Sequence, residues 1–203
     1  MSHFLALVLI PPDATAIETE VAKLLKPYYS ELTVAPYKEY LNQVAVAREV
    51  ERLQQLPKQA IAKLAEDWEV AQDDLEAMAK YELDWFEDEI AGVDEKGSYR
   101  LTTINPLGKW DSYRFIQEES RESGAPLPYP CLVSTLPPVV PYALVTPDGQ
   151  WHEIGMDAGI KAFARQLRGE IIPSQDETAW DLEVERLLQQ YPNYLAIALD
   201  CHC

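Results

Sequence analysis

The first part of the chain alternates between strand and helix patterns. Phe4–Ile10 is apolar at every position, which is typical of a central strand covered on both faces. Apolar residues at helical spacing follow as far as Pro27 and predict a helix. Glu31–Tyr37 predicts a short strand. Strand, helix and strand in this order indicate half of an α/β sandwich.

The last part of the chain shows the same alternation. Tyr142–Thr146 and Gln150–Ile154 flank a Gly-containing turn and predict a β-hairpin. Apolar positions at helical spacing then predict one helix from Met156 to Leu167 and another from Trp180 to Tyr191. Tyr194–Leu199 predicts a final apolar strand.

The middle of the chain is predicted to be a helical insertion covering residues 38–95. Leu41–Leu56 contains neither Pro nor Gly. Beyond Pro57, apolar residues from Ile61 to Met78 form an amphipathic stripe that packs on the preceding helix as an αα-hairpin. Tyr99–Ile104 predicts a short strand, and the repeated prolines of residues 120–141 predict an irregular crossing.

Together these elements predict a single α+β domain over residues 1–203. Its expected core is a mainly antiparallel, four-stranded sheet of the ferredoxin-like kind, made of the N-terminal strand, the hairpin and the C-terminal strand. Helices are expected on one face of this sheet, with the acidic helical hairpin inserted.

Composition narrows the environment of the protein. No apolar run reaches about 18 residues, so a membrane span is not expected. The chain has three cysteines, and this low, odd number does not suit a disulfide framework. It favours a reducing, cytoplasmic location. The formal charge of −17 repels nucleic acid and makes a basic protein surface the expected partner. Acidity that serves only solubility remains the alternative.

Most of this charge is concentrated between Glu66 and Glu95. Thirteen acids stand against the single base Lys80, a net charge of −12. Acidic residues interleaved with exposed aromatic side chains can bind a basic partner. The candidate partner-binding residues are Asp73, Asp74, Glu76, Asp84, Trp85, Phe86, Glu87 and Asp88. A solvated helix end that runs into a loop is the competing interpretation.

Three short motifs resemble a family of uncharacterised phage and prophage proteins. The first is the Gly-containing turn Asp94–Gly97 followed by the Asn-Pro-x-x-Lys-Trp-Asp-x-Tyr motif at 105–113. The second is the hairpin at Pro141–His152, and the third is the closing Asp-Cys-His at 200–202. The resemblance covers both ends and the second half of the chain. It implies a viral origin, hence the cytoplasm of an infected or lysogenic host, and implies no activity.

One stretch departs from the family pattern. Family members resembling this chain usually continue after Lys-Trp-Asp with Trp-Tyr and a Gly-Gly-Arg-Trp segment, whereas Ser112–Gln117 contains no glycine. A ligand site built on those glycines would be lost or changed here.

The motif itself supplies candidate ligand-binding residues. A Gly before a Lys near Asn-Pro could hold an anion through backbone N–H groups, although the Gly-rich phosphate loop is missing. The candidates are Lys109, Trp110, Asp111, Tyr113 and Arg114. The alternative is a Trp that anchors a long loop, with Lys109 paired to an acid.

The C-terminus carries a candidate zinc cluster. In an extended strand Cys201 and Cys203 share one face, and Asp200 and His202 share the other. Antiparallel pairing of the first and last strands would bring His3 nearby, with His152 as a further ligand. A frayed chain end whose Cys201 packs as a small hydrophobe is the alternative.

No nucleophile or paired-carboxylate arrangement stands out, which favours a binding protein over an enzyme. The hypothesis is an acidic, phage-derived protein that inhibits a host nucleic-acid-binding or defence protein through its acidic surface. The alternative is a small ligand-binding protein or enzyme that uses the loop from Lys109 to Arg114.

Overall fold

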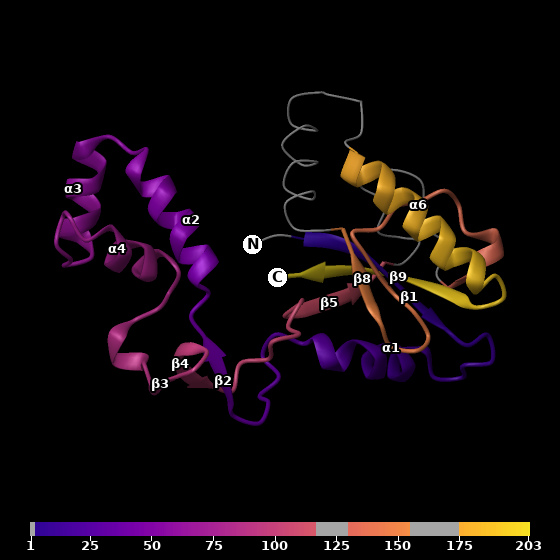
Figure 1. Cartoon of the computed structure of the whole chain (residues 1–203). Coiled ribbons are helices and arrows are strands. Elements are labelled where there is room, and N and C mark those ends of the chain that lie inside the picture. Colours follow the sequence, from indigo (N-terminus) through magenta and orange to yellow (C-terminus); the bar gives the residue numbers. More distant parts are fainter. Residues whose placement is uncertain (1–2, 117–129, 155–174) are drawn as a thin grey trace. The chain divides into compact units, whose positions relative to one another are not determined.

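The computed structural model describes residues 3–116, 130–154 and 175–203, and the chain divides into two compact units (Figure 1). Unit 1 comprises Met1–Thr33 and Ile104–Cys203, and unit 2 comprises Val34–Thr103. The predicted helix from Met156 to Leu167 and residues 120–129 of the Pro-rich crossing lie outside the described residues. In the described ranges no helix is long and apolar enough to cross a membrane.

Unit 1 is built on a mixed sheet of six strands in the order β5-β9-β1-β7-β8, with β6 also paired to β9. Helix α1 continues into a short 3₁₀ turn, η1, and a second such turn, η3, follows β6. The elements are β1 (His3–Ile10), α1 (Ile17–Leu25), η1 (Lys26–Tyr28), β5 (Ser112–Phe115), β6 (Cys131–Leu132), η3 (Val133–Thr135), β7 (Ala143–Val145), β8 (Trp151–Glu153), α6 (Gln175–Gln190) and β9 (Leu195–His202).

The α+β class and four of the sheet strands were predicted, but the plain four-stranded antiparallel sheet was wrong. Strands β1 and β9 pair antiparallel along their whole length, from His3 opposite His202 to Ile10 opposite Leu195. Strand β7 pairs parallel to β1, which makes the sheet mixed. Strands β5 and β6 both pair with β9 and extend the sheet beyond the expected four strands.

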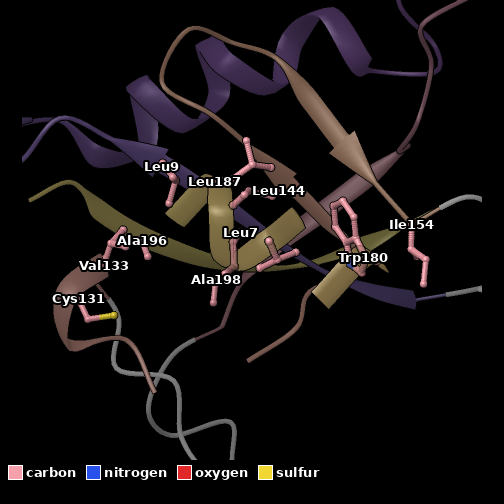
Figure 2. Packing of buried hydrophobic residues seen from close by; sticks show 11 residues of the cluster. Leu7, Leu9, Cys131, Val133, Leu144, Ile154, Trp180, Leu187, Ala196 and Ala198 are labelled. Carbon is pink, nitrogen blue, oxygen red and sulfur yellow. The ribbon is translucent and has the colours of Figure 1, made fainter. Parts of the chain in front are cut away.

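Helices cover both faces of this sheet, so the expectation of one covered face was also wrong. On one face, Val21 and Leu25 of α1 pack with Val8 of β1. On the other face, Trp180 and Leu187 of α6 pack with the alternate residues of β1 and its neighbours, as Figure 2 shows. Side chains alternate between the two faces along a strand, so a strand that is apolar at every position needs both faces covered. The central position predicted for Phe4–Ile10 is confirmed.

Unit 2 combines helices with a three-stranded antiparallel sheet in the order β2-β4-β3. The predicted strand at Glu31–Tyr37 was misplaced, since pairing begins only at Tyr37, after Pro36. The elements are β2 (Tyr37–Tyr40), α2 (Gln43–Gln54), α3 (Lys58–Asp67), α4 (Leu75–Glu82), the 3₁₀ turn η2 (Glu87–Glu89), β3 (Gly92–Asp94) and β4 (Gly97–Thr102). The segment predicted as a helical insertion, 38–95, is therefore only partly helical.

The amphipathic stripe from Ile61 to Met78 is divided between two helices. Helix α3 ends where Glu69 adopts a left-handed conformation, with φ of 55°, and the Val70 N–H donates to the Ala65 carbonyl. This is a Schellman ending built without glycine. The side chain of Asp74 then accepts from the Ala77 N–H and begins α4. The apolar spacing continues across the break because both helices bury their stripes in the same core.

Candidate functional site

The Asn-Pro-x-x-Lys-Trp-Asp motif holds a loop against the end of α1. The buried Asn105 side chain donates to the carbonyls of Pro27 and Tyr29 at 2.8 and 2.9 Å, and its own oxygen accepts from the Leu107 N–H. A Cβ at Gly108 would lie 2.8 Å from the Ser30 Cα, a contact that only glycine avoids. The motif therefore has a structural role.

The five candidate ligand residues of this loop have separate partners. Trp110 is buried and donates to the Leu25 carbonyl at 3.2 Å. Tyr113 packs edge-on against the Trp110 ring. The charged members each bind an opposite charge: Lys109 bonds Glu153 at 2.6 Å, Asp111 bonds His202 at 2.6 Å, and Arg114 bonds Asp200 at 2.7 Å. Their side chains thus contribute to the fold, as the anchored-loop alternative predicted for Trp110 and Lys109, and the ligand site stays a prediction.

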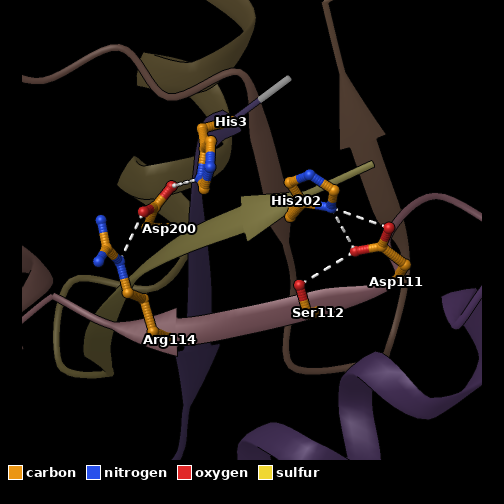
Figure 3. Close-up of polar contacts among 6 residues, drawn as sticks. All are labelled: His3, Asp111, Ser112, Arg114, Asp200 and His202. Atoms are coloured by element: carbon orange, nitrogen blue, oxygen red, sulfur yellow. Dashed lines mark hydrogen bonds and ion pairs between the residues drawn. The ribbon is translucent and has the colours of Figure 1, made fainter. Parts of the chain in front are cut away.

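Arg114 and Asp111 belong to two neighbouring polar clusters across the ends of β1, β9 and β5, shown in Figure 3. In the first cluster, the carboxylate of Asp200 lies 3.1 Å from His3 Nδ1 and accepts a hydrogen bond from Arg114 Nε at 2.7 Å. Beside it, His202 holds the carboxylate of Asp111 and keeps the pKa of that carboxyl below its usual value. The Asp111–His202 contact joins two of the sequence motifs, since Asp111 belongs to the one at 105–113 and His202 to the one at 200–202.

The strand pairing expected for the zinc hypothesis is present, but the ligand set is not assembled. His3 and His202 lie opposite each other with ring centroids 5.1 Å apart. Cys201 is fully buried, and burial raises the pKa of its thiol to about 12, away from the thiolate that zinc requires. His152 lies on β8, which β1 and β7 separate from β9.

Accordingly, the described residues contain no group of three or more His, Cys, Asp or Glu side chains that could hold a metal ion. Cys203 is exposed at the chain end. The zinc site stays a prediction.

The acidic segment of unit 2 is only partly neutralised. Four of its thirteen carboxylates pair with bases: Glu76 with Lys80, Glu82 with Arg52, Glu89 with Arg100 and Asp94 with Lys38. The other nine are exposed, and within the described residues none has an ion pair. These nine, named here the free carboxylates, are Glu66, Asp67, Glu69, Asp73, Asp74, Asp84, Glu87, Asp88 and Glu95.

The aromatic residues of this segment do not match the exposed anchors that we expected. Trp85 is only 6% exposed and belongs to the core of unit 2, so its prediction as an exposed residue was wrong. Arg100 lies over its ring, 4.8 Å from the centroid, and binds Glu39 and Glu89 at 2.7 Å each. Phe86 is half-buried and packs edge-on against Tyr81.

A pocket of about 470 Å³ lies beside these aromatic residues within unit 2. It is formed by α4 and the segments immediately before and after it. Its lining residues are Val70, Ala71, Asp74, Glu76, Ala77, Lys80, Tyr81, Trp85, Phe86 and Glu87. Five of them were candidate partner-binding residues. Lys80 and Tyr81 were missed, because the apolar stripe from Ile61 to Met78 gave no sign of the break between α3 and α4 that precedes the pocket.

The turn between β3 and β4 gives a pH-dependent prediction. Asp94 accepts from Lys38 at 2.7 Å, from the Lys96 N–H and from Tyr40, and these bonds lower the pKa of its carboxyl from 3.8 to about 2. A lowered pKa stabilises the fold above the unfolded pKa, and this contribution disappears as the pH falls through the folded one. We expect Asp94→Asn to destabilise unit 2 at pH 7, with the difference from wild type vanishing between about pH 4 and 2.

Denaturant unfolding across this pH range measures the effect. Glu95→Asn is the matched control, since Glu95 is exposed in the same turn without an ion pair in the described structure. A difference for Asp94→Asn that stayed constant with pH would contradict the assignment.

Comparison of the chain with protein-family models, with curated proteins and with solved structures found no match.

Proposed function

We propose that the protein binds a basic surface of a partner protein through the free carboxylates of unit 2. One observation carries the proposal: nine exposed carboxylates of a single compact unit lack a cationic partner within the described residues. Neutralised acids would indicate a structural role, as Glu82 and Asp94 illustrate. Free acids of one sign repel one another, and a basic partner relieves that repulsion.

The partner class follows from the same charge pattern. Nucleic acid carries roughly one charge per 1.7 Å of duplex axis, and proteins that bind it present rows of Lys and Arg. A dense set of carboxylates can occupy such a basic groove. The resemblance to phage proteins supports a host nucleic-acid-binding protein, such as a defence effector, as the target that is inhibited.

Charge reversal on unit 2 tests this proposal. We expect Asp67, Asp73, Asp88 and Glu95 changed together to Lys to weaken partner binding at least about tenfold, because each change replaces an attraction with a repulsion. Raising the salt from about 50 to 200 mM should weaken wild-type binding by an order of magnitude. Capture from host lysate identifies the basic partner, and titration with the purified partner gives the affinity.

The control carries the same change in net charge on unit 1. Asp13, Glu18, Glu31 and Glu185 are also exposed, so their combined change to Lys should leave binding within a few-fold of wild type. Equal losses in both variants would indicate a general charge effect and refute the assignment to unit 2. Binding that ignores both salt and charge reversal would refute the proposal altogether.

A further inference from the structure

The pocket of unit 2 has walls suited to a flat, cationic group. Tyr81 is stacked on Trp68 with centroids 5.0 Å apart and an interplanar angle of 19°, and Phe86 meets Tyr81 edge-on at 5.1 Å. These contacts fix the rings before a ligand enters. A volume of about 470 Å³ lies within the range of roughly 300–1,000 Å³ that is usual for ligand pockets.

The charges around the pocket define the sign of the ligand. Asp74, Glu76 and Glu87 face a single base, Lys80. Lys80 is already bound to Glu76 at 2.7 Å, which leaves Asp74 and Glu87 without a cation in the described structure. Aromatic rings with nearby carboxylates favour a cation over a neutral or anionic ligand.

Unit 2 already contains one group of this chemistry. The Arg100 guanidinium lies over the Trp85 ring and bonds two carboxylates, Glu39 and Glu89. A guanidinium combines ring stacking with directed bonds to carboxylates, whereas an ammonium is a more strongly hydrated point charge. The pocket offers the same combination of rings and carboxylates to an external group, since Arg100 is not among its lining residues.

A second observation concerns Trp85, which lines the pocket. Its indole N–H is buried and lacks a hydrogen-bond acceptor within the described structure. A buried donor without an acceptor costs about 1–3 kcal/mol. A peptide carbonyl could reach this donor only after a neighbouring side chain moved, so Trp85 serves as a reporter of pocket occupancy.

We propose that this pocket binds the side chain of one arginine on the partner protein, with Glu87 and Asp74 at the guanidinium and the rings of Tyr81 and Phe86 against its plane. The proposal rests on the function proposed above and adds a specific anchor to it. Dispersed charges raise association rates, whereas a single residue seated in a pocket slows dissociation.

Titration of the full-length protein with N-acetyl-arginine N-methylamide tests the inference. We expect saturable shifts of the Trp85 indole resonance, assigned by its loss in Trp85→Phe, at millimolar ligand. The citrulline analogue has nearly the same shape without the charge and should bind at least about tenfold more weakly. Equal shifts with both compounds, or none with arginine, would overturn the proposal.

Two variants test the charge of the ligand. Glu87→Gln should weaken arginine binding several-fold, and Lys80→Gln should tighten it, because the only base of the pocket is removed. Glu95→Gln lies outside the pocket and should change nothing. Weaker binding by Lys80→Gln would identify an anion site instead.

The two proposals fail in different ways. The variant with Asp67, Asp73, Asp88 and Glu95 changed to Lys keeps every residue that lines the pocket. It should therefore still bind the arginine compound. If the charge reversal weakens partner binding but the arginine compound does not bind to the wild-type protein, only the pocket inference is refuted. Arginine binding without any salt-sensitive partner would remove only the proposed function.

Discussion

Replacing Trp110 with alanine is expected to lower the free energy of unfolding of unit 1 by about 3–5 kcal/mol. The side chain is 9% exposed, packs against Tyr29 and Tyr113 with both centroid distances 5.0 Å, and donates to the Leu25 carbonyl. Its own carbonyl accepts from the Ser30 N–H at 2.8 Å. Removal therefore leaves a cavity at the junction of α1, the motif loop and β5.

Hydrogen exchange resolved by residue measures this loss, since it reports β1, β9 and α1 separately from unit 2. Trp110→Phe is the matched variant: it keeps an aromatic ring and removes the indole bond, so it should cost about 1–2 kcal/mol. A cost for alanine no larger than that for phenylalanine would show that packing at Trp110 contributes little.

Replacing Arg100 with alanine should have the next largest effect, a loss of about 2–3 kcal/mol in unit 2. The guanidinium bonds Glu39, Glu89 and the Asp84 carbonyl and lies over Trp85. Its side chain is 21% exposed and those of Glu39 and Glu89 are 39% and 47% exposed, so solvent screening reduces the loss below that of a fully buried cluster.

The conservative variant Arg100→Lys separates geometry from charge. A lysine keeps the charge and lacks the planar fork that reaches all three oxygens, so it should recover only a small part of the loss. Exchange rates in α4 and β4 report the effect, and those in β1 and β9 serve as the internal control. Full rescue by lysine would show that charge alone matters at this position.

The elements with a strong local pattern were predictable from the sequence. The apolar stretch Phe4–Ile10 of β1, the β7–β8 hairpin around Gly149 and the stripe of α6 are confirmed. Strands β5 and β6 lack such a local pattern. They are strands because they pair with β9, which is distant in the sequence. The parallel pairing of β1 and β7 likewise depends on a crossover that no short sequence window contains.

The candidate sites show the same limit. The sequence shows the run of acids but does not show which of them lack an ion pair. Three of the four bases that pair with them, Arg52, Lys38 and Arg100, lie outside the run. Two helices end at residues in the left-handed conformation, Glu69 and Asp84. Neither residue is a glycine, so the sequence does not mark these helix ends. The acidic neighbours of Trp85 predict an exposed side chain, whereas this side chain lies in the core of unit 2.

Unit 2 begins and ends at one point, because the Val34 N–H donates to the Thr103 carbonyl at 3.0 Å. A segment whose two ends meet can be inserted into a loop of another protein without stretching that loop. The acidic surface and its pocket thus belong to a segment that can be removed or replaced as a whole, because the strands paired in the sheet of unit 1 all lie outside it. Such a segment can change its own surface without any change in the strand pairing of the scaffold that carries it.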